Sequence, residues 1–172
     1  MNRRLFTSVL FACLLPFMVQ AQQAVFRFAQ LTDIHLSPNN PNPTEDLLRS
    51  IAQINATDSI DFVLATGDIA EEGDRTTMEK VKSCLDLLKV KYYVVLGNHE
   101  TKWSDSGCTA FGEIFGGERF EFEHKGFLFL GFNSGPLMRM AYGHVVPQDI
   151  RWMTETMDRY NAGNSRPDKP VI

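Results

Sequence analysis

The sequence predicts an α/β fold built around a parallel sheet. Three short apolar segments alternate along the chain with two segments whose apolar residues recur at helical spacing. Strands separated by helices are joined by right-handed crossovers, and such crossovers make neighbouring strands parallel. The chain has 172 residues, of which 44% are hydrophobic and 22% charged, so it is large enough to bury one core. We therefore expect one α/β domain over residues 22–172.

The first strand is expected at 25–31, where a short apolar run leads into Thr-Asp-Ile-His. A loop rich in proline and asparagine follows at 37–43. Thr44 is expected to cap the next helix, because apolar side chains recur at helical spacing between Leu47 and Ile54. The first strand should therefore run into a polar loop and return through a helix.

The second and third strands are expected at 61–66 and 92–96, on either side of an amphipathic helix at 74–89. Both strands contain continuous apolar runs, which are typical of parallel strands buried on both faces. Each strand ends in a glycine followed by a polar residue, Asp68 in one case and Asn98 in the other.

The second half of the chain has a different pattern. Charged and aromatic residues alternate at 119–123 and an apolar run follows at 127–132, which predicts a hairpin with His124 in its solvated turn. A helix is expected at 147–160, with a proline at its start. Another strand begins at 170–172.

The first residues have the layout of a secretory signal peptide. Two arginines precede an apolar run, and Val19-Gln20-Ala21 offers a cleavage site, so we expect residues 1–21 to be removed on export to the periplasm or the outside. The run is short for a membrane-spanning helix of about 20 residues. An uncleaved anchor and lipid attachment at Cys13 stay open as alternatives. No membrane span is expected after cleavage.

Cleavage would leave Cys84 and Cys108, which could form a disulfide in an oxidising compartment. Cys84 falls on the apolar face of the second predicted helix, where it has the features of a small core residue. We therefore favour two unpaired thiols.

Polar residues follow each predicted parallel strand at its carboxyl end, the edge where ligands bind in open α/β sheets. Asp33 and His35 are two positions apart, so in an extended segment both side chains would face one ion. Asp68 follows a glycine that permits close approach of a neighbouring strand. Asn98 and His99 follow the third strand. The carboxylate, imidazole and amide ligands suit Mn, Fe or Zn, and the absence of thiolates excludes a zinc finger.

Each of these residues has an ordinary explanation when it is taken alone. An aspartate at a strand end often caps a helix, and a Gly-Asn pair is common in turns. Three successive strand ends that all carry potential ligands favour a common site instead.

The three motifs at 33–35, 67–68 and 97–100 (Asp-Ile-His, Gly-Asp and Gly-Asn-His-Glu) resemble the first three motifs of the calcineurin-like metallophosphoesterase family. The resemblance extends over about 26–172. It implies a two-sheet α/β sandwich flanked by helices, with two divalent or mixed-valence metal ions. By this resemblance, Asp33 and His35 would bind the first ion, Asp68 would bridge both ions, and Asn98 would bind the second.

The same resemblance implies that His99 contacts the phosphate and protonates the leaving oxygen, with Glu100 helping to orient it. The implied activity is hydrolysis of phosphate monoesters or diesters, with attack by a metal-bound hydroxide. The substrate class stays open between nucleotides, cyclic nucleotides, phospholipids, phosphoproteins and sugar phosphates. The alternative is a non-catalytic scaffold or an inactive fragment with this fold.

The sequence also departs from the family pattern. A complete member has a further histidine after the strand that begins at 170–172, and then a Gly-His-x-His motif. We therefore expect the chain to be truncated and inactive as it stands. His144 and Arg139 are weaker candidates for contacts with an anionic substrate. The net charge of −4 argues against nucleic-acid binding through a basic patch.

Overall fold

The structure is a computed structural model and describes residues 25–135, 142–162 and 170–172. The expected signal segment, Cys13 and Arg139 lie outside the described residues. The elements follow in the order β1 (Phe28–Leu31), α1 (Asn42–Ala56), β2 (Phe62–Thr66), α2 (Arg75–Leu85), β3 (Lys91–Val95), a π-helical turn (His99–Trp103), α3 (Thr109–Phe115), β4 (Phe120–His124), β5 (Phe127–Gly131) and α4 (Pro147–Ala162).

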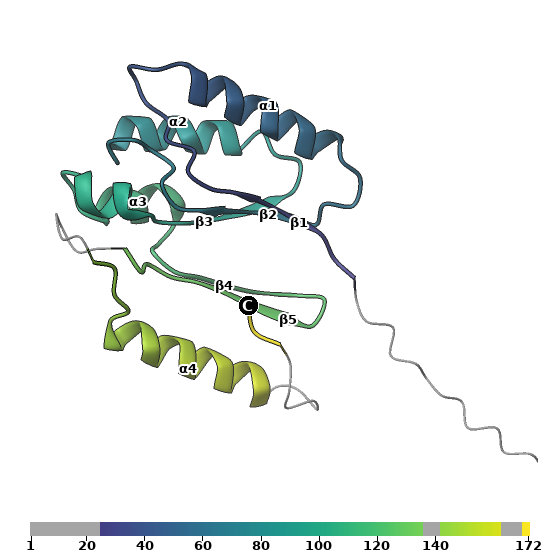
Figure 1. The fold of residues 1–172 in the computed structure, drawn as a ribbon. Coiled ribbons are helices and arrows are strands. Elements are labelled where there is room, and N and C mark those ends of the chain that lie inside the picture. The colour runs from purple at the N-terminus through teal and green to yellow at the C-terminus, as the bar shows by residue number, and fades with distance from the viewer. Residues whose placement is uncertain (1–24, 136–141, 163–169) are drawn as a thin grey trace, which may run out of the picture.

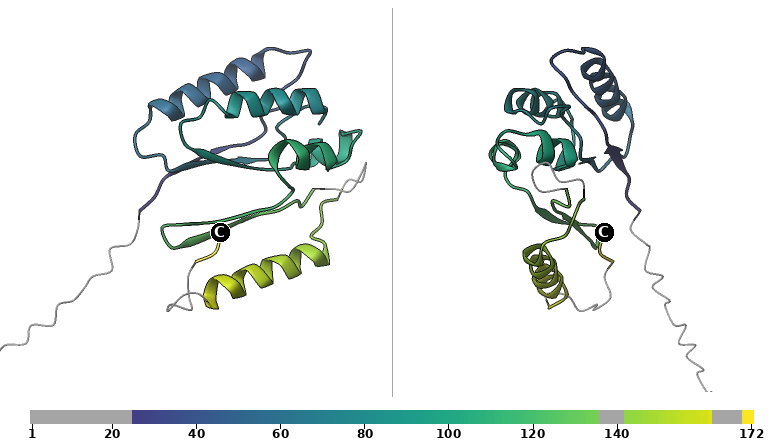
Figure 2. Two further views of the ribbon diagram at one scale, coloured as in Figure 1. Left: turned by 180° about the vertical axis from the view of Figure 1, so that it is seen from behind. Right: turned by 60° about the vertical axis from the view of Figure 1, so that its left-hand side comes forward.

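The described elements form four layers (Figure 1). Helices α1, α2 and α3 cover one face of the sheet β1–β2–β3, the hairpin β4–β5 lies against the other face, and α4 covers the far side of the hairpin. The views in Figure 2 show the same stacking from two further directions. This architecture confirms the predicted α/β class and has the two sheets and flanking helices that the resemblance implied.

The three-stranded sheet is parallel throughout, as predicted. In its register Phe28 pairs with Phe62, and Phe62 pairs with Lys91. Because the strands run in the same direction, the loops that follow them leave the sheet at one edge. Those loops carry the three polar motifs.

The helices begin where local chemistry allows. α2 starts after Asp74, whose side chain accepts a hydrogen bond from the Thr77 N–H at 2.9 Å. The expectation that Thr44 caps α1 is wrong: the helix begins at Asn42 after Pro41, with Pro43 in its first turn. Proline at a helix start costs no hydrogen bond, because the first N–H groups have no partner inside the helix.

The main core lies between the helices and the parallel sheet. It contains aliphatic side chains from both layers together with the aromatic ring of Phe111 from α3. Cys84 is buried in this core and Cys108 lies at its margin, and both are free thiols, as favoured from the sequence. Burial raises the pKa of the Cys108 thiol to about 11, which keeps it protonated near neutral pH.

A second, aromatic core joins the two sheets. Tyr93 of β3 stacks on Phe122 of β4 with ring centroids 3.8 Å apart, and Phe62 of β2 packs edge-on against Phe129 of β5 at 5.0 Å. Phe122 and Phe129 stack on each other across the hairpin. This interface fixes the hairpin beneath the sheet.

The hairpin confirms the predicted strands but changes the role of His124. The turn is the pair Lys125 and Gly126, both with positive φ, as a two-residue hairpin turn requires. His124 is the last residue of β4 and is half-buried, with Nε2 3.3 Å from the Asp61 carboxylate. The prediction of a solvated turn histidine is therefore wrong.

Residues 170–172 continue the second sheet. The N–H of Leu128 donates to the carbonyl of Pro170, and the N–H of Ile172 donates to the carbonyl of Leu128. Val171 and Leu128 form an isolated parallel bridge, so the segment where a strand was expected to begin lies beside β5. Among the described residues, no helix combines the length and the apolar character needed to cross a bilayer.

Substitution of Phe129 should test the aromatic core. Phe129 is 2% exposed, and Phe129→Ala should lower the free energy of unfolding by about 3–5 kcal/mol because it leaves a cavity between the sheets. Urea denaturation measures this loss. Leu87→Ala, at a side chain that is 57% exposed, is the control and should change stability by less than about 1 kcal/mol. Equal losses in both variants would contradict the assignment of this core.

Candidate metal centre

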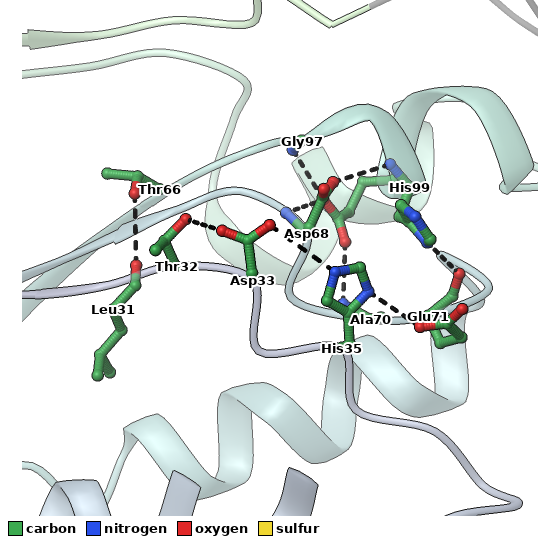
Figure 3. A network of polar contacts seen from close by, with 11 residues as sticks. Leu31, Thr32, Asp33, His35, Thr66, Asp68, Ala70, Glu71, Gly97 and His99 are labelled. Carbon is green, nitrogen blue, oxygen red and sulfur yellow. Dashed lines mark hydrogen bonds and ion pairs between the residues drawn. The ribbon is translucent and has the colours of Figure 1, made fainter.

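Three loops bring the predicted ligands together at the carboxyl edge of the parallel sheet. Potential ligand atoms of Asp33, His35 and Asp68 all lie within 4.8 Å of one another. Figure 3 shows these three side chains converging, with Glu71 and His99 beside them. The His35 Nε2 atom lies 3.8 Å from the Asp33 carboxylate. The loops that follow β1 and β2 are far apart in the sequence, and together they supply one compact group of oxygen and nitrogen atoms.

Backbone hydrogen bonds hold the first loop against the second. The N–H of His35 donates to the carbonyl of Asp68 at 2.9 Å, and the N–H of Leu36 donates to the carbonyl of Ile69 at 3.1 Å. The N–H of Asp33 also donates to the carbonyl of Gly67. The parallel pairing of β1 and β2 therefore continues into the loops and sets the spacing between the ligands.

The ligand segment is not extended, contrary to the sequence-based expectation. Asp33, His35 and Asp68 have φ values of 53°, 48° and 49°, in the left-handed region that residues with a Cβ seldom adopt. Such conformations cost about 1–3 kcal/mol each and are concentrated at functional sites. The side chains converge because of this backbone geometry and not because of strand alternation.

Two glycines allow the second and third loops to meet. A Cβ on Gly97 would lie 2.1 Å from the Asp68 carboxylate oxygen and 2.3 Å from the Asp68 nitrogen. Gly67 has φ of +90°, and a Cβ there would lie 2.8 Å from the Cα of Gly97. The close approach expected at Gly67 is thus present, and Gly97 is the residue that leaves room for Asp68.

Glu100 is fully buried beneath these loops. Its carboxylate accepts hydrogen bonds from the N–H groups of Gly97 at 2.7 Å, Ala70 at 2.9 Å and Asp68 at 3.1 Å. Burial raises the pKa of this carboxyl group, and the N–H groups of Ala70 and Gly97 oppose that rise. Glu100 therefore holds the backbone of the second loop to that of the third.

That Glu100 helps to orient His99 stays a prediction; the contacts of the His99 ring are with other residues. The His99 Nδ1 atom instead contacts the backbone carbonyl of Glu71, while the His99 N–H donates to the Asp68 carboxylate at 3.0 Å. The His99 ring also packs edge-on against His35, with centroids 4.6 Å apart. His99 is thus fixed beside the ligand group through Asp68 and Glu71.

A cavity of about 550 Å³ opens beside the two carboxylates of the ligand group. Asp33, Asp68 and Asn98 line it, which brings the fourth predicted ligand to the same space. Lys102, whose ammonium lies 4.8 Å from the centroid of the Trp103 ring, lines the cavity as well. A cation beside carboxylates and an amide can attract an anionic group into the cavity.

His144 lies in a different place from the ligand group. It lines a neighbouring cavity of about 420 Å³ together with Arg119 and Asp149, and its N–H donates to the carbonyl of Ser134. Gly135 borders both cavities, so the two spaces adjoin. A substrate contact by His144 stays a prediction, as does one by Arg139.

The sequence-based reasoning did not identify Glu71 or Lys102. The Glu71 carboxylate lies 2.9 Å from His35 Nδ1, and potential ligand atoms of His35, Glu71 and His99 lie within 4.8 Å of one another. Glu71 follows Asp68 by three residues and belongs to no helical or strand pattern. Its spacing from the Gly-Asp motif was the one available signal.

The donor set fits divalent cations. Carboxylates, an imidazole and a side-chain amide are ligands of first-row ions, and the group faces an open cavity. Two carboxylates held close together repel each other unless a cation or a proton lies between them. Asp33, His35, Asp68 and Asn98 would hold such ions, although their number and identity stay predictions.

Comparison with known proteins agrees with this arrangement. A family model described as calcineurin-like phosphoesterase matches residues 26–166. The uncharacterized protein YvnB of Bacillus subtilis is 25% identical over 130 residues, which are 66% of this chain and 10% of that protein. A 3',5'-cyclic-nucleotide phosphodiesterase of Nostoc sp. is 24% identical over 132 residues, which are 73% of this chain and 48% of that enzyme. The chain thus spans less than half the length of these curated relatives.

Gly97→Ala should displace Asp68 and weaken divalent-ion binding at least tenfold, because the new Cβ overlaps the Asp68 carboxylate. Calorimetric titration with Mn²⁺ measures the affinity. The matched control is Gly112→Ala in α3, where the nearest atom to a new Cβ is 4.0 Å away and the affinity should not change. Undiminished binding in Gly97→Ala would show that the position of Asp68 does not control the ion.

Glu100→Ala should lower the free energy of unfolding by about 3 kcal/mol or more, because it leaves buried N–H groups without an acceptor. Chemical denaturation measures the loss. Glu79→Ala on the exposed side of α2 is the control, and removing its surface pairing with Arg75 should cost less than about 1 kcal/mol. A loss at Glu100 no larger than that at Glu79 would disprove a structural role for the buried carboxylate.

Proposed function

The chain belongs to the calcineurin-like phosphoesterase family, and from this premise we propose that the protein, as its own cells produce it, hydrolyses phosphate esters at the site formed by Asp33, His35, Asp68 and Asn98, where the cavity lined by Asp33, Asp68 and Asn98 opens. The family consists of metal-dependent phosphoesterases, which are hydrolases. The single observation that carries the proposal is the position of His99. Its ring lies against His35 while its backbone is bound to Asp68, so an acid–base group is fixed beside the ligand set.

Each residue has a distinct part in the proposed reaction. Asp33, His35, Asp68 and Asn98 would hold divalent ions, which when bound polarise a phosphoryl group and activate water. The Asp68 carboxylate accepts a hydrogen bond from the His99 N–H, and this bond orients the carboxylate toward the ligand group. Lys102 lines the same cavity and supplies positive charge for the phosphate.

His99 is proposed to protonate the leaving oxygen. Its Nδ1 atom contacts the Glu71 carbonyl, which can only accept a hydrogen bond, so Nδ1 carries a proton. The other ring nitrogen, Nε2, is then the atom available to a substrate. A histidine that is protonated at both nitrogens can give the Nε2 proton to the departing alkoxide and keep the Glu71 contact.

We propose that the substrates include phosphodiesters. The relative from Nostoc is named a 3',5'-cyclic-nucleotide phosphodiesterase, which favours a diester among the classes left open by the sequence. The layout of residues 1–21 supports a reaction outside the cytoplasm. The non-catalytic scaffold stays the alternative, and it predicts the opposite result in the following experiment.

His99→Gln should lower kcat for bis-p-nitrophenyl phosphate by about 10²–10⁴-fold, because the leaving group loses its proton donor. The assay uses the protein as its own cells produce it, with added Mn²⁺. Binding of Mn²⁺ by this variant should stay close to that of the wild type, since His99 is not a proposed ligand. Asp68→Asn, in contrast, should weaken Mn²⁺ binding together with activity.

The matched control is His124→Gln, which changes a histidine paired with Asp61 away from the ligand group and should leave kcat unchanged. Comparison of p-nitrophenyl phosphate with the diester separates monoesterase from diesterase activity. A wild-type protein that binds Mn²⁺ but hydrolyses neither ester would support the scaffold and reject the enzyme.

A further inference from the structure

We propose that the cavity beside His144 is a second part of the substrate site and receives an uncharged, polar organic group of the phosphate ester, as a nucleoside is. The inference rests on the proposed function, because it places the phosphate in the cavity lined by Asp33, Asp68 and Asn98. It names a class of substrate and gives a role to residues outside the three polar motifs.

The two cavities adjoin at Gly135, which lines both of them and lies in the loop that follows β5. Gly135 packs against Thr101 of the π-helical turn, where an added Cβ would lie 2.8 Å from the Thr101 hydroxyl oxygen. An ester whose phosphate occupies the first cavity can therefore extend its organic group past Gly135 into the second. The volume of the second cavity, about 420 Å³, lies within the range of about 300–1,000 Å³ that is usual for pockets that bind small molecules.

The cation of the second cavity is held by fixed partners. Nε of Arg119 donates to Oδ1 of Asp149 at 2.6 Å, and Nη2 of Arg119 contacts the same oxygen. The guanidinium carbon also lies 5.5 Å from the centroid of the Trp152 ring. The Asp149 side chain is buried, whereas that of Arg119 is 38% exposed. Because a guanidinium has five N–H groups, Arg119 can donate to a ligand without leaving Asp149.

A second set of contacts holds the acceptors in place. The side-chain amide of Asn133 donates to Oε2 of Glu118 at 3.0 Å and accepts a hydrogen bond from the N–H of Gly135 at 2.9 Å. The Glu118 side chain is exposed, and its two carboxylate oxygens can accept further hydrogen bonds from a ligand. Groups that are already held in place lose little conformational freedom when a ligand binds.

The balance of charge argues against a second anion in this cavity. Its lining contains one cation, Arg119, and two carboxylates, Glu118 and Asp149, together with the polar side chains of Asn133 and His144. Since Arg119 is paired with Asp149, the cavity has no excess positive charge that would attract another phosphate. A hydrocarbon chain would remove water from these polar groups without replacing its hydrogen bonds. The hydroxyl and amide groups of a nucleoside replace them.

The competing role for these residues is purely structural. The pair of Arg119 and Asp149 joins the residue before β4 to the first turn of α4, and it would do so without any ligand. In that case the cavity would hold water and would not distinguish between organic groups. Glu118 separates the two roles, because its exposed carboxylate lines the cavity and takes no part in the pair of Arg119 and Asp149.

The test is calorimetric titration of the Mn²⁺-loaded protein, as its own cells produce it, with the phosphonate analogues of thymidine monophosphate and hexyl phosphate. A carbon replaces the ester oxygen in both, so neither is hydrolysed. We expect the thymidine analogue to bind at least about tenfold more tightly, since several hydrogen bonds favour it.

Glu118→Gln should reduce this preference about three- to tenfold, because it removes a charged acceptor. The altered charge acts on both phosphonates and cancels in the ratio of their affinities. Glu155→Gln is the matched control, because Glu155 is an exposed glutamate of α4 outside the lining of both cavities, and it should keep the wild-type preference. Circular dichroism confirms that each variant is folded before it is compared.

A second measurement does not depend on the metal. In nitrogen-15 NMR spectra of the metal-free protein, thymidine alone should shift the amide signals of Gly117, Asn133 and Val146, which line the cavity. Shifts confined to other parts of the chain would overturn the inference. So would equal affinity for the two phosphonates, or a full preference in Glu118→Gln. A protein that shows the expected shifts but binds no Mn²⁺ would support the cavity as a nucleoside site and reject the proposed metal-dependent function.

Discussion

The buried carboxylate of Glu100 is the interaction on which the geometry of the site depends. It accepts hydrogen bonds from N–H groups of Asp68, Ala70 and Gly97, and so binds the loop after β2 to the loop after β3. A buried charge is tolerated only where hydrogen bonds replace its hydration. Here those bonds also fix Asp68 beside Gly97, where no side chain would fit. The stability of the loops and the placement of the proposed ligand thus have one physical cause.

Two features of the site are energetically unfavourable in the free protein, and a bound cation can offset them. Asp33, His35 and Asp68 adopt left-handed backbone conformations, and two of them are carboxylates that repel each other. Backbone hydrogen bonds between the first two loops and the rigid sheet beneath them supply the opposing stability. A divalent cation would remove the repulsion. The proposed chemistry follows from this preorganised concentration of negative charge, with His99 fixed at its edge.

Much of the fold could be predicted because it depends on local patterns. The apolar runs that became β2 and β3, the amphipathic residues of α2 and the alternation in β4 have periods that the sequence displays directly. The convergence of Asp33, His35 and Asp68 followed from parallel topology. Their left-handed backbone did not, because it is imposed by hydrogen bonds between loops. Glu71 was missed for the same reason: its relation to His35 exists only after β1 and β2 have paired. The short helix α3, with glycines inside it and at its end, gives too weak a periodic signal to be predicted.

The most direct test of the central claim is a crystal structure of the protein soaked in Mn²⁺, with anomalous scattering used to locate the ions. The account predicts anomalous density enclosed by Asp33, His35, Asp68 and Asn98. Density enclosed by His35, Glu71 and His99 instead, or no density at the ends of the three strands, would contradict the account.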